Sequence, residues 1–236
     1  LHKEYRRQRQ MCIRDRSYVA LLSHSGSRGL GAAIAKHYSL LAREVCRLPR
    51  EAQHFAWLDL DSEAGQEYWM SMNLAGDYAR ACHERIHLNL AKALGLKPLA
   101  NVNNHHNFAW KEEIAPGRMA IVHRKGATPA QEGQPGLIPG SMATAGYLVC
   151  GKGVEDALNS ASHGAGRAMS RQKAKDSFTQ SALKKMLSQA GVTLIGGSVE
   201  EMPLAYKDIG RVMHMQETLV EVQGRFMPRV VRMNKE

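Results

Sequence analysis

Apolar residues recur at helical spacing in three stretches of the chain. A helix is predicted over residues 32–45, where the apolar positions fall on one side. A longer helical segment covers residues 62–94 and ends at Gly95, with a break expected near Gly76. A third helix is predicted over residues 178–190. Each stretch also has a polar side, so these segments are expected to be surface helices.

Short runs of β-branched and aliphatic residues lie between these stretches and predict strands. They cover residues 18–22, 119–122, 147–150, 192–195, 219–222 and 230–233. The last two are expected to form a closing pair. Residues 126–141 hold four glycines and three prolines and are expected to be loop. Together the segments predict one mixed α/β (α+β) domain with short strands, long site-forming loops and surface helices.

The composition adds a clear basic excess. The 236 residues include 32 Lys and Arg against 22 Asp and Glu, a net charge of +10. Such a charge favours polyanionic partners such as RNA, DNA or nucleotides; the alternative is a merely basic soluble protein. Residues 1–16 carry part of the excess and are interpreted as a solvated basic arm or as non-native sequence.

Four widely spaced cysteines without a CxxC pair indicate free thiols in a reducing compartment. No apolar run approaches the ~18 residues that a bilayer span needs. A cytoplasmic protein that does not enter a membrane is therefore expected.

Three segments combine histidine with small or polar residues and are candidates for a functional site. Residues 23–31 (SHSGSRGLG) join a predicted strand to a predicted helix, where backbone amides can bind an anion; the alternative is a tight turn. Residues 101–110 are polar and rich in His, and residues 162–167 (SHGAGR) place glycines and an arginine beside a histidine. Imidazole ligates metals and can act as a nucleophile, although a lone histidine is more often structural.

Several cationic side chains in or beside these segments suit RNA or triphosphate oxygens. They are Arg28, Arg124, Lys125 and Arg167. For Arg124 and Lys125 the alternative is a solvated strand end. If the cations do bind RNA, its affinity should fall steeply with salt.

Six motifs, in order along the chain, resemble one protein family closely. They are HSGSRGLG (24–31), HHNFAW (105–110), VHRKGATPA (122–130), GQPGLIPGSMATAGY (133–147), SHGAGRAMSR (162–171) and AYKDI (205–209). The set resembles the RtcB-type RNA ligases, above all a branch linked to a peptide-release-factor-like protein. The resemblance implies a GTP- and manganese-dependent ligase. It would join an RNA 2′,3′-cyclic phosphate or 3′-phosphate end to a 5′-hydroxyl end through a guanylated histidine, in RNA repair or tRNA splicing.

The resemblance also implies roles for individual residues. The guanylated histidine would be His163, and the metal ligands present would be His24 and His106. The motifs that contact GMP and phosphate contain Asn107, Ser141, Ala165, Gly166 and Arg167. Tyr206 matches the aromatic residue that stacks on guanine, and Lys235 is the nearest candidate for the lysine that reads the base. Two Mn²⁺ ions are the implied cofactors and GTP the co-substrate, with an archease-like activator or a release-factor-like protein as candidate partners.

The family's upstream DxGCG-type and GGGNH-type motifs, which carry further metal ligands, have no counterpart before His24. Residues 17–236 are therefore expected to be the C-terminal part of an RtcB-like ligase domain. The chain alone is expected to have little ligase activity, because a metal site needs more ligands than those present. A non-catalytic nucleotide- or RNA-binding module is the alternative, and a metal-dependent phosphatase or nuclease is a weaker one.

Overall fold

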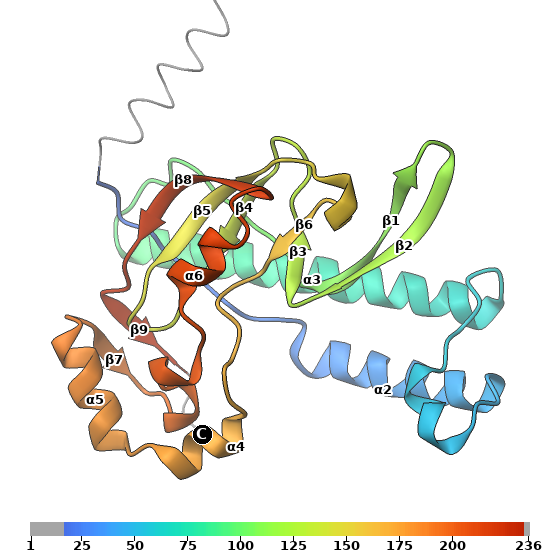
Figure 1. Cartoon of the computed structure of the whole chain (residues 1–236), viewed down its shortest axis with the longest axis horizontal. Helices are drawn as coiled ribbons and strands as arrows, with labels where there is room; N and C mark the ends of the chain where they lie inside the picture. Colours follow the sequence, from blue (N-terminus) through green and yellow to red (C-terminus); the bar gives the residue numbers. More distant parts are fainter. Residues whose placement is uncertain (1–16, 234–236) are drawn as a thin grey trace, which may run out of the picture. The chain divides into compact units, whose positions relative to one another are not determined.

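The structure, a computed structural model, describes residues 17–233, and these fall into two compact units (Figure 1). One unit comprises residues 19–101, and the other comprises residues 102–233 with residues 17 and 18. Helices and strands are both well represented, which confirms the mixed α/β class predicted from the sequence. No helix among residues 17–233 is long and apolar enough to cross a membrane.

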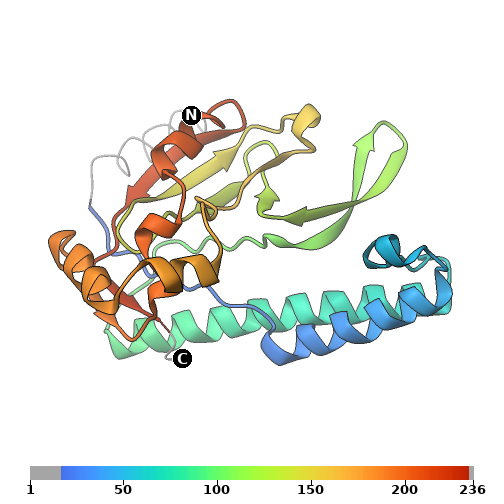
Figure 2. The same ribbon diagram turned by 60° about the horizontal axis from the view of Figure 1, so that its bottom comes forward.

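The unit of residues 19–101 is built from two helices. These are α2 (Arg28–Val45) and α3 (Glu63–Ala93), joined through the 3-10 turn η1 (Arg50–Phe55). The helices lie side by side (Figure 2). The ring centroids of Tyr38 and Tyr68 are 5.2 Å apart across this packing. Apolar and aromatic side chains at helical spacing therefore hold the pair together, as the pattern in α2 predicts.

Local signals explain where α3 begins and ends. The hydroxyl of Ser62 accepts a hydrogen bond from the Gly65 amide at 3.1 Å and caps the first turn. Gly95 follows the helix with φ of +64°, a backbone conformation that suits glycine. The break expected near Gly76 is wrong, and α3 is continuous there. One glycine costs a helix only about 1 kcal/mol, which the rest of this long helix offsets.

Residues 18–22 are not a buried strand, so that prediction is wrong. The segment has no regular secondary structure, and Val19 is 78% exposed. A strand must pair its backbone with a neighbour, and no strand within residues 17–233 pairs with this run. The glycine-rich loop is also shorter than expected, because α2 already begins at Arg28.

The unit of residues 102–233 begins with an antiparallel hairpin. Its strands β1 (Asn107–Ala115) and β2 (Arg118–Lys125) project from the rest of the unit (Figure 1). Strand β3 (Ala127–Pro129) follows directly and pairs antiparallel with β6 (Ser160–Ser162). The chain thus runs from the hairpin into β3, which pairs with the segment just before His163.

A three-stranded antiparallel sheet follows, in the order β4–β5–β8. Its strands are β4 (Pro135–Ile138), β5 (Gly146–Gly151) and β8 (Val220–Phe226). The loop expected over residues 126–141 therefore contains two short strands. Pro129 ends β3 and Pro135 begins β4, where a missing amide proton is best tolerated.

The closing pair expected between residues 219–222 and 230–233 does not form. Strand β8 pairs with β5, whereas β9 (Val230–Arg232) pairs in parallel with β7 (Thr193–Ile195). The short connection contains Pro228, which cannot donate a ladder hydrogen bond. The chain therefore leaves one sheet before it enters the other.

Short helices complete this unit. They are α4 (Arg171–Ser177), α5 (Gln180–Gln189) and α6 (Ile209–His214), with the 3-10 turns η2 (Glu155–Ala157), η3 (Val199–Glu201) and η4 (Pro203–Ala205). The helix predicted over residues 178–190 is confirmed as α5. Helices α4 and α6 have two turns or fewer, too few for a periodic pattern to reveal them.

Two apolar clusters form the core of this unit. One joins the three-stranded sheet to α6 and contains Ile138, Val149, Ala165, Ile209, Met213 and Val220. The other packs α5 against neighbouring loops and contains Met142, Leu183, Leu187, Val192 and Met202. Ala165 belongs to the SHGAGR motif, so that motif is anchored directly in the core.

Truncation of Leu183 tests the second cluster. Leu183 is fully buried, so Leu183→Ala should lower the free energy of unfolding by about 2–5 kcal/mol through lost burial and a residual cavity. Leu204→Ala is the matched control, because Leu204 is 54% exposed and its loss should cost less than about 0.5 kcal/mol. Urea denaturation measures both changes, and equal midpoints would contradict the placement of Leu183 in the core.

Candidate functional site

Two of the histidines singled out by the sequence lie beside each other. His106 immediately precedes β1, and His163 immediately follows β6. Their ring centroids are 4.7 Å apart, with the ring planes inclined by 33°. The HHNFAW and SHGAGR motifs therefore meet at one place, although 57 positions separate the two histidines.

Gly126 joins the two histidine segments. Its amide donates to the His106 carbonyl at 3.1 Å, and its carbonyl accepts from the His163 amide at 3.3 Å. Its φ of +77° lies in the left-handed region that favours glycine. A Cβ at this position would lie 3.8 Å from two atoms of the His163 ring. The glycine of VHRKGATPA therefore brings the two histidines together through its backbone.

The Nδ1 atom of His163 is buried and has no hydrogen-bond partner in the described part of the chain. Buried polar atoms are usually paired, so an orphaned ring nitrogen is a feature to explain. An uncharged imidazole nitrogen with no competing partner can attack an electrophile or accept a ligand's hydrogen bond. The position is compatible with the nucleophilic role that the resemblance implies for His163, which stays a prediction.

The SHGAGR loop is fixed to the turn that carries Ser141. The Ala165 amide donates to the Pro139 carbonyl at 3.1 Å. The Thr144 hydroxyl lies 2.9 Å from the hydroxyl of Ser141 and accepts from its amide at 2.7 Å. Two motifs predicted to contact nucleotide, GQPGLIPGSMATAGY and SHGAGRAMSR, are therefore adjacent.

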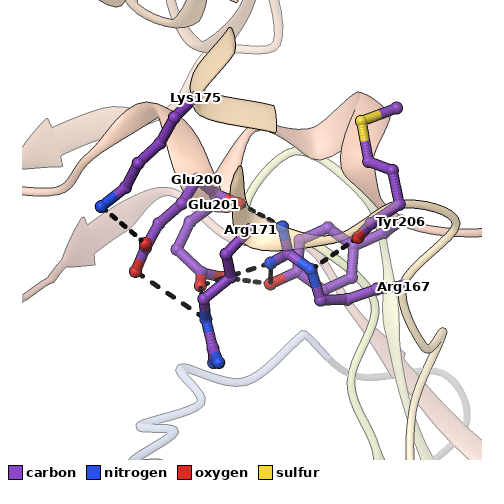
Figure 3. A network of polar contacts seen from close by, with 7 residues as sticks. Arg167, Arg171, Lys175, Glu200, Glu201 and Tyr206 are labelled. Carbon is purple, nitrogen blue, oxygen red and sulfur yellow. Dashed lines mark hydrogen bonds and ion pairs between the residues drawn. The ribbon is translucent and has the colours of Figure 1, made fainter. Parts of the chain in front are cut away.

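Arg167 makes extensive contacts within the protein (Figure 3). Its Nε donates to the Met169 carbonyl at 3.0 Å, and Nη2 donates to the Glu200 carbonyl at 2.6 Å. Nη1 lies 3.5 Å from the Glu201 carboxylate and 3.4 Å from the Tyr206 hydroxyl. The guanidinium carbon is 5.2 Å from the Tyr206 ring centroid. A phosphate role for Arg167 stays a prediction, and it would require some of these partners to be exchanged.

The SHGAGR and AYKDI motifs also pair through their backbones. Arg167 and Tyr206 form an isolated antiparallel bridge. The Ala168 amide donates to the Ala205 carbonyl at 2.8 Å, and the Lys207 amide donates to the Gly166 carbonyl at 3.0 Å. The proposed guanine-stacking residue is thus tied to the loop that follows His163.

Two glutamates, which the sequence reasoning missed, balance the cations of this network (Figure 3). Glu200 lies 3.2 Å from Lys175 and 3.9 Å from Arg171, and Glu201 lies 3.8 Å from Arg171. The adjacent acidic pair in η3, just upstream of AYKDI, was the available signal. The exposed ends of Arg171 and Lys175 limit how much these pairs stabilise the fold.

The pKa of Tyr206 is raised to about 12. Burial of the ring contributes most, and the Glu201 carboxylate, which accepts a hydrogen bond from the phenol, adds to the effect. The Arg167 guanidinium partly opposes both. Tyr206 therefore remains a neutral donor at physiological pH.

Arg124 does not reach out to solvent, so its predicted role in binding RNA or triphosphate oxygens is wrong. Its side chain is buried and forms a bidentate pair with Glu112. It also donates hydrogen bonds to Ser160 Oγ and to the Leu158 carbonyl. The solvated strand end, the alternative interpretation, is wrong for Arg124 as well. Lys125, the next residue, is exposed.

His24 lies in the unit of residues 19–101, where two histidines of α3 hold the segment around it. Ser23 Oγ shares a hydrogen bond with His87 Nε2 at 2.9 Å, and the Ser25 amide donates to His83 Nε2 at 3.2 Å. His83 and His87 are one helical turn apart on one face of α3. Sequence reasoning missed both, although their i, i+4 spacing was visible.

The metal ligands that the resemblance implies, His24 and His106, lie in different units of the structure. Within residues 17–233 no three His, Cys, Asp or Glu side chains form a group that could hold a metal ion. His106 lies beside His163, for which the resemblance implies the role of nucleophile and not of metal ligand. The pairing of His24 with His106 stays a prediction, and Lys235 lies outside the described residues.

The family that the six motifs resemble agrees with comparisons to known proteins. The sequence model of the family described as "tRNA-splicing ligase RtcB" matches residues 4–234. The chain belongs to the RtcB family. It is 33% identical over 227 residues to the RNA-splicing ligase RtcB of Escherichia coli (strain K12), and 32% identical over 251 residues to the tRNA-splicing ligase RtcB of Nanoarchaeum equitans.

These RtcB alignments cover most of this chain but only part of the relatives. They include 90% and 92% of the chain, and 55% and 52% of the E. coli and N. equitans proteins. The chain thus spans about half the length of the curated RtcB relatives it matches. Within that half, the structure places His106, which precedes Asn107, beside His163, which precedes the loop of Ala165 and Gly166. The roles that the resemblance implies for these residues stay predictions.

Neutralising Glu201 tests the electrostatics at Tyr206. Glu201→Gln should lower the pKa of Tyr206 below about 12, because the carboxylate charge that favours the protonated phenol is lost. The pKa of Tyr206 is measured by the ultraviolet absorbance of tyrosinate during a pH titration, with Tyr206→Phe in the same protein as the reference. Glu200→Gln is the matched control, because the Glu200 carboxylate faces Arg171 and Lys175 instead.

The raised pKa of Tyr206 makes the stability of the folded protein depend on pH. Folded protein keeps the Tyr206 proton up to about pH 12, whereas the unfolded chain releases it near 10. This contribution to stability is therefore complete below pH 10 and is lost as the pH rises toward 12. An unchanged pKa in Glu201→Gln would show that Glu201 does not influence the phenol.

Proposed function

We propose that this chain carries the nucleotide-transfer part of a GTP-dependent RNA ligase, in which His163 becomes guanylated. The observation that carries the proposal is the orphaned Nδ1 of His163, buried beside His106 at the start of a glycine-rich loop. Membership of the RtcB family supports it, because the relatives are named RNA-splicing ligases. The finer chemistry is what the resemblance to the RtcB-type ligases implies.

In the proposed reaction, a ring nitrogen of His163 attacks the α-phosphorus of GTP. A nitrogen–phosphorus bond forms, the bond between the α-phosphorus and its bridging oxygen breaks, and pyrophosphate leaves. The resulting phosphoramidate transfers GMP to an RNA 3′-phosphate and returns the histidine. The 5′-hydroxyl of a second RNA end then displaces GMP and forms the phosphodiester bond.

The neighbouring motifs would orient the nucleotide. The Gly166 and Arg167 amides and the Ser141 hydroxyl would hold phosphate oxygens, whereas the Ala165 amide donates to the Pro139 carbonyl and fixes the loop. Asn107 would contact the nucleotide beside His106. The Tyr206 ring would stack on guanine. Its neutral hydroxyl and its tie to Arg167 support a fixed ring position.

We extend the proposal to the cofactors, partners and location that the resemblance implies. Manganese dependence would need ligands beyond His24 and His106, the two that the resemblance implies in this chain. RNA with 3′-phosphate or 2′,3′-cyclic phosphate and 5′-hydroxyl ends would be the substrate, consistent with the net charge of +10. An archease-like activator or a release-factor-like protein would be a partner, and the free thiols of Cys46, Cys82 and Cys150 suit the cytoplasm.

Replacement of His163 tests the covalent step. Incubation with manganese and GTP labelled at the α-phosphate should give an acid-labile protein adduct, as expected of a phosphoramidate. His163→Ala should lose the adduct completely, because no other residue is proposed to be the nucleophile. His123→Ala is the control, since His123 is exposed on the β1–β2 hairpin, and it should keep the adduct.

Labelling that persists in His163→Ala would overturn His163 as the nucleophile. GTP binding without any adduct in the parent chain would instead favour the non-catalytic binding module.

The shortage of metal-binding groups predicts a weak joining reaction. With RNA ends of the proposed chemistry, this chain should join far less RNA than the E. coli relative under the same conditions, because His24 and His106 are only part of the ligand set that the resemblance implies. Gel electrophoresis of labelled RNA measures the product. Equal rates for the two proteins would contradict the prediction.

A further inference from the structure

Arg124 is 2% exposed and lies at the base of the β1–β2 hairpin. Its Nη1 and Nη2 donate to the two carboxylate oxygens of Glu112 at 2.8 and 2.7 Å. Nε donates to Ser160 Oγ at 2.8 Å, and Nη2 also donates to the Leu158 carbonyl at 2.9 Å. The guanidinium carbon lies 4.9 Å from the Trp110 ring centroid. A single side chain thus connects the hairpin to the segment before His163.

Stability alone is a poor explanation for this arrangement. The desolvation of a buried ion pair offsets most of its attraction, and well-packed apolar side chains often stabilise a fold as well or better. A bidentate arginine–carboxylate pair instead fixes the orientation of the guanidinium, and the planar group then holds its remaining donors at set positions. Here those donors point at Ser160 and Leu158.

The segment that Arg124 holds has an unusual backbone. Leu158 and Asn159 have φ of +49° and +48°, in the left-handed region that non-glycine residues seldom adopt. Such conformations persist where the surroundings impose them. Arg124 binds on both sides of Asn159, at the Leu158 carbonyl and at the Ser160 hydroxyl. The pair therefore holds the turn from which β6 starts.

Strand β6 carries that constraint to His163. It pairs with β3 in a three-residue register, Ala127 with Ser162 and Pro129 with Ser160. At its far end, the His163 amide donates to the Gly126 carbonyl, two residues after Arg124. A ladder this short contributes little resistance to slipping. The position of β6 is thus set at one end by the Arg124 contact to Ser160 and at the other end by the Gly126 contact to His163.

We propose that the Arg124–Glu112 pair is a positioning device for His163. It sets the start of β6, and through this short strand it sets the place of the His163 ring beside His106. Only the expected effect on guanylation rests on the proposed function; the expected position of the His163 ring does not. Loss of the pair should slow guanylation at saturating GTP while leaving the KM for GTP nearly unchanged, because neither residue is placed against the nucleotide.

The experiment removes the pair without leaving an unpaired buried charge. The full chain carrying Arg124→Met together with Glu112→Leu loses every contact to Ser160 and Leu158 but keeps apolar bulk next to Trp110. Ser160→Ala is a milder second variant that removes only the hydroxyl contacts. Arg80→Ala is the matched control, because Arg80 forms an exposed ion pair with Asp77 at 2.9 Å on α3.

Two readouts are compared. The first is the rate of GMP adduct formation as a function of GTP concentration, where the double variant should lose about 10-fold to 100-fold in kcat, the scale expected for a misplaced reacting group. The second is the NMR signal of the His163 ring, assigned with His163→Gln. This signal should shift in the double variant and in Ser160→Ala, and it should stay in place in Arg80→Ala.

The second readout separates this inference from the proposed function. If the parent chain forms no adduct, guanylation fails as a proposal, and the His163 ring signal still decides the positioning role. A folded double variant with an unmoved ring signal and unchanged kcat would overturn it. If the double variant does not fold, Ser160→Ala decides: an unmoved ring signal there overturns the proposal, and a shifted one supports it.

Discussion

The site depends on two backbone hydrogen bonds at Gly126. One reaches the segment of His106, the other reaches the segment of His163, and a residue with a side chain would adopt this left-handed conformation only with strain. Main-chain atoms of Gly126 therefore link the two segments whose imidazoles lie beside each other. The adjacent Arg124–Glu112 pair adds a second attachment to the same strand, so the position of His163 is set from both ends of β6.

A second network fixes the other side of the loop after His163. The backbone pairing of Arg167 with Tyr206 joins two motifs, and the Glu200–Glu201 pair neutralises the cations that gather there. This neutralisation has a cost for ligand binding, because an anionic phosphate that recruits Arg167 must displace a carboxylate already in place. The Tyr206 phenol stays protonated mainly because it is buried, and the hydrogen bond that it donates to Glu201 adds to the effect. The network therefore holds the Tyr206 ring in place and occupies the donors of Arg167.

Sequence reasoning predicted the elements whose signals are local. Ser62 and Gly95 mark the ends of α3, and the apolar runs of β5 and β7 mark strands. It failed where pairing decides: residues 18–22 have the composition of a strand but no neighbour within residues 17–233, and β8 and β9 pair with distant strands rather than with each other. It failed for Arg124 too, because Glu112, the residue that buries it, lies across a hairpin that the sequence did not reveal.

The sequence by itself determined the family, because six motifs in a set order carry their residue types regardless of folding. It also determined the helices that have their own caps and periodic faces. Only the tertiary structure decided which motifs meet, which cations remain exposed and which imidazole nitrogen lacks a partner. Those properties depend on distances between residues far apart in the chain, and such distances exist only after strands pair and side chains are buried.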